Sequence, residues 1–449
     1  VVMSLMYQGL FAVDSKNNTT PILCSQYQVT PDNRTWTIYL EPNATFSDGT
    51  RVTVQDVVAS YEQARQNVYY KGRFTHIARV ELSSDGGVDF FLDTPYQNLA
   101  LLLDIPIVKA SEVTADNPLG TGPYSLEDGI GGKHLQRVVG WWCSSDDLVA
   151  KDSSIALVEA ESPSQIRDEF EFSGLSVVCT NPQTDSYADY RCDFELWEVD
   201  SGFMMYIGCN VTYSKFFDDG TLRTFLTYGI DRQTLVDDNY GGLALPTTLP
   251  ISPMSPYYSK SLATNYDYDE MRFIDAASKF RVPTNDKGVP RTLQLLVNSD
   301  DSARLRCARN IAATLTELGL ACETVESPTS VYEARLQAAN YDIYLGITKL
   351  PTTADLSEFY RQWGEMSWGG LANETIYNMV NQSLADRGNY YNLHKLVADD
   401  GRIIPVMAGY YAIYAKRGVL SDLNPARDNV FYYTLGKTME SSKVATQFS

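Results

Sequence analysis

The sequence predicts an α/β protein with more than one domain. The chain has 449 residues, more than one compact core usually accommodates, so two or three domains are expected. Its first half is strand-rich, with apolar and polar residues alternating at 35–40, 88–92 and 155–160, the pattern of half-buried strands. Its second half contains a strand–helix–strand segment, the unit from which parallel sheets are built.

The first clear helix is predicted at about 53–66, after the strand at 35–40 and a turn. The turn is the sequence Ser-Asp-Gly at 47–49, where Asp can bond its own backbone and Gly accepts a positive φ. Thr53 is the expected N-cap, and Asp56 occupies the capping-box position three residues later.

The strand–helix–strand segment lies in the second half of the chain. A short apolar strand is predicted at 292–298, a helix from there to about 318, and a second strand at 321–327. Gly319 follows the last periodic residue and is a plausible helix stop. The apolar residues of the helix recur at helical spacing and predict one buried face: Leu305, Ala308, Ile311, Ala312, Leu315 and Leu318.

Three further helical regions and two long loops complete the second half. Helices are predicted within 218–242, at 375–386 and at 389–399. The loops at 245–258 and 349–359 are rich in Pro, Ser, Thr and Tyr. Long structured loops are often functional because the core does not need them.

The amino-acid composition excludes several classes of protein and of binding partner. Hydrophobic residues make up 44% of the chain and charged residues 20%, as in folded soluble proteins. The net charge of −20 disfavours binding to nucleic acid and to anionic membrane surfaces, because no basic field gathers phosphates. The sequence has no run of eighteen apolar residues, so no transmembrane helix is predicted. The opening residues lack a basic region and a cleavage site, so we expect that the true start was removed.

Residues for catalysis or for a cofactor are scarce. The sequence contains no GxSxG elbow, HExxH helix or phosphate loop, and its three histidines lie far apart. The scarcity of histidine therefore disfavours a Ser-His-Asp triad, a metal cluster and a nickel site. Among the seven cysteines no CxxC pair occurs, while Cys307 with Cys322 or Cys179 with Cys192 could form disulfides in an oxidising compartment. We predict no enzyme, no cofactor and no metal.

Six segments, spread over nearly the whole chain, carry further motifs: MYQGLFAVD (6–14), FSDGTRVTVQDV (46–57), NPLGTGPY (117–124), MYIGCN (205–210) followed by FFDDGTLRTFLTYGIDRQTLVDDNYGG (216–242), YDIYLG after the strand–helix–strand unit (341–346), and IIPVMAGYYAIYAKRGVLSDLNP (403–425). In this order they resemble motifs of the family 5 extracellular solute-binding proteins, the receptors of peptide, nickel and related ABC importers.

The resemblance implies a two-lobed fold of the periplasmic-binding-protein type II, with ligand trapped as hinged lobes close. Lobe one would comprise 1–202 with a small subdomain at about 35–115, lobe two 203–405, and 406–449 would return to lobe one. The implied function is a bacterial receptor that captures a small polar solute, such as a short or modified peptide, for an ABC permease. The alternative is a ligand sensor or surface binding module on the same fold, and a hydrolase is a more distant rival.

The same resemblance sets expectations for partners and location. The protein is expected outside the cytoplasm, at the cell surface or in the periplasm, as a monomer. A lipid anchor absent from this sequence would be its link to the membrane, and no nucleic acid would bind.

The chain departs from its peptide-binding relatives after the last strand of the strand–helix–strand unit. There the family's Gly-Trp…Asp-Tyr stretch supplies an Asp that holds the peptide's amino group. Here Ile347 replaces the Trp, Leu350 replaces the Asp in the simplest alignment, and Lys349 adds a cation. Recognition of a free amine is therefore doubtful unless Asp355 reaches the site.

Several polar and aromatic residues near the resembling motifs are the predicted ligand contacts. Each also has a structural interpretation, such as a packed aromatic for Tyr7 or a solvated surface lysine for Lys349. The tryptophans lie in an irregular stretch, where lining a ligand site is one reason for a large ring in a loop. The predicted set is Tyr7, Tyr206, Asn210, Lys349, Leu350, Trp363, Trp368 and Tyr410.

Overall fold

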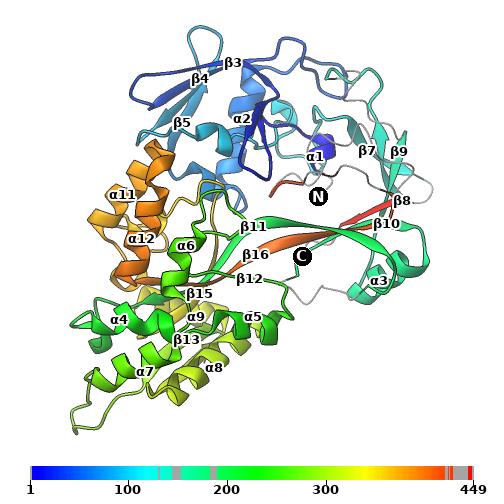
Figure 1. Ribbon diagram of the computed structural model, residues 1–449. Helices are drawn as coiled ribbons and strands as arrows, with labels where there is room; N and C mark the ends of the chain where they lie inside the picture. Colours follow the sequence, from blue (N-terminus) through cyan, green and yellow to red (C-terminus); the bar gives the residue numbers. More distant parts are fainter. Residues whose placement is uncertain are drawn as a thin grey trace. The chain divides into compact units, whose positions relative to one another are not determined.

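The computed structural model describes residues 3–129, 132–143, 153–182, 190–419, 423, 425–427 and 443–446. Two compact units share the chain (Figure 1): unit 1 is 1–201, 351–353 and 411–449, and unit 2 is 202–350 and 354–410. Two long strands, β11 (Phe194–Cys209) and β16 (Ile403–Lys416), each run from one unit into the other.

The chain divides between these units at 201/202 and at 410/411, and residues 351–353 also belong to unit 1. The resemblance predicts lobe boundaries at 202/203 and 405/406, and the assignment of hinged lobes stays a prediction. Much of the predicted return to lobe one, including 428–442, lies outside the described residues.

Unit 1 contains a four-stranded antiparallel sheet in the order β3-β4-β6-β5. Helix α2 (Val54–Arg65) packs on it, with the Tyr61 ring edge-on to Phe90 at 5.0 Å between centroids. The predicted capping box is confirmed, because Thr53 accepts a hydrogen bond from the Asp56 backbone and Asp56 accepts one from the Thr53 backbone. The strands are β3 (Cys24–Val29), β4 (Thr35–Leu40), β5 (Ile77–Leu82) and β6 (Val88–Leu92).

The remaining strands of unit 1 pair in the order β16-β10-β17-β9-β8-β7, where only the end of β16 belongs to this unit. A separate pair, β1 with β2, lies near the start of the chain. These elements are α1 (Met3–Met6), β1 (Phe11–Val13), β2 (Thr19–Pro21), β7 (Tyr124–Gly129), β8 (Gly132–Arg137), β9 (Ser154–Val158), α3 (Pro163–Phe172), β10 (Leu175–Thr180) and β17 (Lys443–Thr446).

Unit 2 is built on strands in the order β14-β13-β15-β11. The predicted strand–helix–strand unit is confirmed: β13 (Leu293–Asn298) pairs in parallel with β14 (Cys322–Ser327), and α8 (Ser302–Glu317) connects them. Asp301 caps the helix, and Gly319 follows its end with a φ of 97°. Strand β15 (Ile343–Lys349) pairs in parallel with β13 and antiparallel with β11.

Short helices complete unit 2, and the predicted helices at 375–386 and 389–399 are present. The other elements are α4 (Thr221–Phe225), α5 (Arg232–Tyr240), β12 (Leu245–Pro246), α6 (Lys260–Ala263), α7 (Glu270–Lys279), α9 (Thr329–Gln337), α10 (Ser357–Tyr360), α11 (Glu374–Ala385) and α12 (Tyr390–Asp400).

The cysteines form no disulfide. All seven lie in described residues and are free thiols, so neither Cys307–Cys322 nor Cys179–Cys192 is a bridge. Within the described part of the chain, no helix combines the length and the apolar character needed to cross a bilayer.

Candidate functional site

Tyr7 is the one predicted contact in unit 1. Its ring is buried, and its hydroxyl donates a hydrogen bond to the Pro118 carbonyl at 3.0 Å. Pro118 lies two residues before the Gly-Thr-Gly-Pro-Tyr turn at 120–124, where a Cβ on Gly120 would lie 2.1 Å from the Met6 carbonyl oxygen. The turn therefore packs against the backbone just before Tyr7, and this contact is structural. A ligand contact of Tyr7 stays a prediction.

Tyr206 lies in the middle of the β11–β15 pair of unit 2. It faces Gly346 across the strands, and Gly208 faces Tyr344 in the same way. A Cβ on Gly208 would lie 2.2 Å from the Tyr344 ring, and one on Gly346 would lie 2.6 Å from the Tyr206 ring. Each glycine thus leaves room for the tyrosine opposite.

The Tyr206 ring is enclosed by other aromatic rings. It is 3% exposed and lies edge-on to Phe359, with 5.0 Å between the ring centroids. Burial outweighs the hydrogen bond from Tyr344 and raises the pKa of Tyr206 to about 12. Tyr206 is therefore a neutral member of an aromatic core, and a contact with ligand stays a prediction.

Lys349 and Leu350 lie at the end of β15. Lys349 pairs with Phe203, and the Leu350 backbone donates to the Gly202 carbonyl at 2.9 Å. The Leu350 side chain is buried, whereas Ile347, two residues earlier than Lys349, is 38% exposed.

Asp355, the carboxylate that would have to replace the family's peptide-holding Asp, follows this strand end. It is 7% exposed, and its Oδ1 accepts a hydrogen bond from the Ser357 backbone at 2.8 Å, at the start of α10. Its carboxylate therefore already has a local structural role. Capture of an ammonium by Asp355 gains no support from this contact.

Asn210 follows the last residue of β11 and is 1% exposed. Its Nδ2 donates to the carbonyls of Ala339 and Tyr341, at 2.9 and 2.8 Å, and its Oδ1 accepts from the Tyr213 backbone at 3.1 Å. Both amide hydrogens and the amide oxygen are therefore used within unit 2. Binding of a solute by this side chain would require one of these hydrogen bonds to break.

Trp368 lies near Asn210. It begins a short 3₁₀ turn, Trp368–Gly370, in which the Gly369 carbonyl accepts a hydrogen bond from the Thr212 backbone at 3.2 Å. A Cβ on Gly369 would lie 2.9 Å from the Asn210 Cα. The structure thus brings together two predicted residues, Asn210 and Trp368, through backbone packing.

The group around Lys349 and the group around Asn210 lie at opposite ends of the same strand pair. Asn210 follows the pairing of Cys209 with Ile343, whereas Lys349 is the last residue of β15. Six residue steps at about 3.4 Å each place these ends about 20 Å apart. A solute of a few heavy atoms cannot contact both groups.

Trp363 occupies a tightly built loop and is 88% exposed. Its φ of 65° lies in the left-handed region, which bulky residues rarely adopt. The Glu358 side chain accepts the Glu365 backbone N–H at 2.8 Å and pairs with Arg361 at 2.6 Å. A Cβ on Gly364 would lie 2.2 Å from the Glu358 carbonyl oxygen. The loop therefore holds the Trp363 ring in solvent, in a backbone conformation that needs this support.

Tyr410 is the last residue of unit 2 on β16 and is 3% exposed. Its neighbours on that strand are buried as well. A contact between Tyr410 and a solute stays a prediction.

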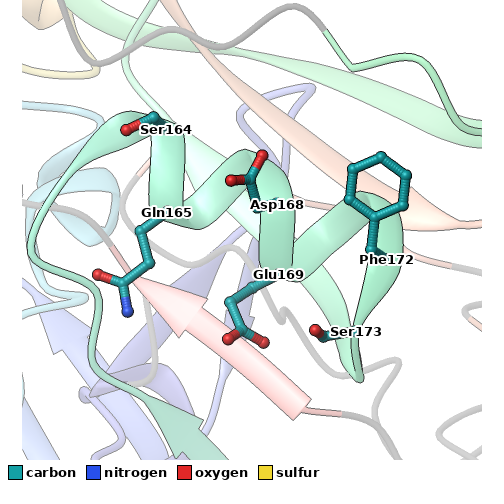
Figure 2. A pocket seen from close by; sticks show the side chains of 6 residues that line it. All are labelled: Ser164, Gln165, Asp168, Glu169, Phe172 and Ser173. Atoms are coloured by element: carbon teal, nitrogen blue, oxygen red, sulfur yellow. The ribbon is translucent and has the colours of Figure 1, made fainter.

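A hollow of about 410 Å³ lies along α3 in unit 1. Figure 2 shows its six lining side chains projecting from this one helix and its C-cap, among them Asp168, Glu169 and the 80% exposed Phe172. None of the predicted contacts lines it. Within the described residues, no group of three or more His, Cys, Asp and Glu side chains is placed to hold a metal ion.

Curated relatives match part of the chain. The glutathione-binding protein GsiB of Escherichia coli O6:K15:H31 is 25% identical over 288 residues, which cover 59% of this chain and 54% of GsiB. The chain thus spans about half the length of the curated relatives it matches.

Solved structures match almost the whole fold. The unliganded, open form of the periplasmic murein tripeptide binding protein MppA has a TM-score of 0.78 at 15% identity, covering 97% of this chain and 92% of MppA. NikA from Brucella suis in complex with Fe(III)-EDTA has a TM-score of 0.75 at 17% identity, covering 96% of this chain and 94% of NikA. At these identities the likeness shows the α/β fold alone.

The family match covers most of the chain. The model described as bacterial extracellular solute-binding proteins, family 5 middle, matches residues 18–369, a span that includes the capped α2, the strand–helix–strand unit and both loop tryptophans. This is a family of binding proteins, not of enzymes. The chain belongs to the bacterial extracellular solute-binding proteins of family 5.

Proposed function

We propose that this protein is the receptor of a bacterial ABC importer and that its solute is a short or modified peptide. The observation that carries the proposal is the family match over residues 18–369. Two similar proteins are named for ligands of similar size, since GsiB is a glutathione-binding protein and MppA is a murein tripeptide binding protein. Delivery to a permease follows from the same family membership, and a lipid anchor would place the receptor at the cell surface.

Lys349 is proposed to determine which charged group of the solute binds at the end of β15. It is the last residue of β15, and the next residue, Leu350, carries an apolar side chain where the resemblance places the Asp of peptide-binding relatives. An ammonium at this strand end would meet a cation, whereas a carboxylate would meet an opposite charge. The proposed solute therefore presents a carboxylate to Lys349, and a free amino terminus is not required.

A metal complex is the weaker candidate. NikA was solved with Fe(III)-EDTA, but the described residues of this chain hold no ready cluster of metal ligands. A chelate bound through its own carboxylates would still be compatible with a cation at Lys349, so chelates belong among the test compounds.

The first experiment identifies the solute. Protein purified without refolding is denatured, and the released small molecules are measured by mass spectrometry. In parallel, thermal unfolding is followed with glutathione, tripeptides to nonapeptides, their N-acetylated and C-amidated forms, and metal chelates. A ligand at 100 times its Kd stabilises the folded state by about 2.7 kcal/mol. The expected result is stabilisation that survives N-acetylation and is lost on C-amidation.

The second experiment uses a matched pair of lysine variants. Lys349→Gln should weaken binding of the identified solute by about tenfold, the effect of about 1.4 kcal/mol. Lys287→Gln, at an exposed hairpin of the same unit, should bind as the parent protein does. Equal affinity in both variants would remove Lys349 from the site. A complete panel without stabilisation, together with no released solute, would contradict the receptor function itself.

A further inference from the structure

A second polar hollow lies wholly within unit 2 and contains none of the predicted solute contacts. Its volume is about 540 Å³, within the range of small-molecule sites. Its walls come from the turn at 226–229, the segment 264–269, α7 and α12. The residues that matter for the argument are Tyr228, Tyr266, Asp267, Arg272, Lys395 and Asp399.

Several charged groups of the hollow are already paired. The Tyr266 hydroxyl donates to Asp399 Oδ1 at 2.6 Å, and the Lys395 ammonium pairs with Asp399 Oδ2. Asp269 is the N-cap of α7, where its Oδ1 accepts the Arg272 backbone N–H at 2.9 Å. These contacts hold the wall together.

One cation in the hollow is fixed in position without a carboxylate partner. The Arg272 guanidinium lies over the Tyr228 ring, 3.7 Å from its centroid. Among the described residues its side chain forms no ion pair and no hydrogen bond. Stacking orients the planar guanidinium but leaves its N–H groups available, and that planar fork suits a carboxylate.

Tyr228 and Asp267 are two further groups of the hollow that can contact a ligand. Tyr228 lines the hollow and is 5% exposed, and its hydroxyl has no hydrogen-bond partner in the described part of the chain. Asp267 is exposed and likewise forms no hydrogen bond or ion pair with a described residue. The Asp267 carboxylate interacts electrostatically with the buried Arg232, but the two side chains do not form a salt bridge. The groups that carry the argument are therefore the Arg272 guanidinium, the Tyr228 hydroxyl and the Asp267 carboxylate.

We propose that this hollow binds a zwitterionic amino acid, at a site separate from the transported solute. Arg272 would receive the amino acid carboxylate, the Tyr228 hydroxyl would donate to the same carboxylate, and Asp267 would receive the ammonium. A simple anion is disfavoured because the carboxylates of Asp267, Asp269 and Asp399 line the same hollow. A simple cation is disfavoured by Arg272 and Lys395, so the set of charges favours a ligand that carries both signs.

The test uses the full chain and L-phenylalanine as the probe, observed by saturation-transfer NMR up to about 10 mM, a range that detects weak millimolar binding. Binding is expected for L-phenylalanine and is expected to be at least about tenfold weaker for 3-phenylpropionate and for phenethylamine, each of which lacks one charge. Absence of L-phenylalanine binding, or equal binding of the singly charged analogues, overturns the proposal.

Variants place the binding in this hollow. Arg272→Gln and Asp267→Asn should each weaken L-phenylalanine binding by about tenfold, and Tyr228→Phe, which keeps the stacked ring, should weaken it less. Arg281→Gln, an exposed arginine just beyond α7, is the matched control and should bind as the parent does. Thermal unfolding checks that each variant is folded. Retained binding in both Arg272→Gln and Asp267→Asn would assign the signal to another site and refute this one.

Discussion

Acid should destabilise unit 2 through a single buried imidazole, His394. This side chain lies on α12, is 0% exposed, and neither ring nitrogen has a hydrogen-bond partner. Its nearest ring neighbour is Tyr390, 5.8 Å away between centroids. Burial without any compensating partner lowers the pKa of His394 from 6.5 to about 4, because the protonated form cannot be solvated there.

The sign and size of the effect follow from this pKa. The unfolded chain takes up a proton near pH 6.5 and the folded chain only near pH 4. Between these values the unfolded state binds more protons, so stability is complete above pH 6.5 and falls as the pH falls towards 4. At 1.36 kcal/mol for each pH unit, the loss reaches about 3 kcal/mol.

Urea unfolding at pH 7.5 and at pH 4.5 measures this loss, with His394→Leu as the reference. Carboxylates also titrate in this range, but they contribute equally to both proteins, so the difference isolates the imidazole. The parent should lose about 2 to 3 kcal/mol more than His394→Leu between the two pH values. Because two units need not unfold together, the transition of unit 2 is the one to compare. Equal losses in parent and variant would refute the reasoning.

Two further predictions concern packing and helix capping. Gly208→Ala places a Cβ 2.2 Å from the Tyr344 ring and should lower the free energy of unfolding by about 1–3 kcal/mol through overpacking. Gly72→Ala, where nothing lies within 4 Å of the added Cβ, is the control and should leave urea unfolding nearly unchanged. Equal free energies of unfolding in the two variants would contradict the tight fit around Gly208. Thr53→Ala removes one half of the α2 capping box and should lower the free energy of unfolding by about 1 kcal/mol. Thr53→Ser, which keeps the hydroxyl, should recover most of that loss, and a failure to recover it would assign the effect to the lost methyl group.

Local patterns were sufficient for some of the helices and strands, whereas the long strand β11 (Phe194–Cys209) and the helix α7 (Glu270–Lys279) were not predicted. The capped helix after Thr53 and the helix ending before Gly319 are each specified by residues within a few positions of their ends, where capping and turn chemistry act. The disulfide pairs could not be decided in this way. Cys307 and Cys322 are near in sequence, but whether two sulfur atoms meet depends on the packing of α8 against β14.

The candidate site was harder to predict because its residues are defined by distant partners. Asn210 reads as a polar strand-end residue, but its amide bonds carbonyls about 130 positions later in the chain. The hollow around Arg272 has a local signal only in the alternation Tyr-Asp-Tyr-Asp at 266–269. Its cation and its buried Tyr228 come from segments that sequence spacing does not connect.

The reciprocal placement of Tyr206 over Gly346 and of Tyr344 over Gly208 limits which substitutions these four positions can accept. Neither ring can be kept if the glycine opposite it gains a side chain, so the four positions must change together or not at all. A slide of β15 by two residues would bring each ring onto a neighbour that has a Cβ, and the misaligned pairing would be rejected by steric clash. A chimaera that exchanges β15 with a homologous strand will therefore fold only if the donor carries the same alternation of large and absent side chains.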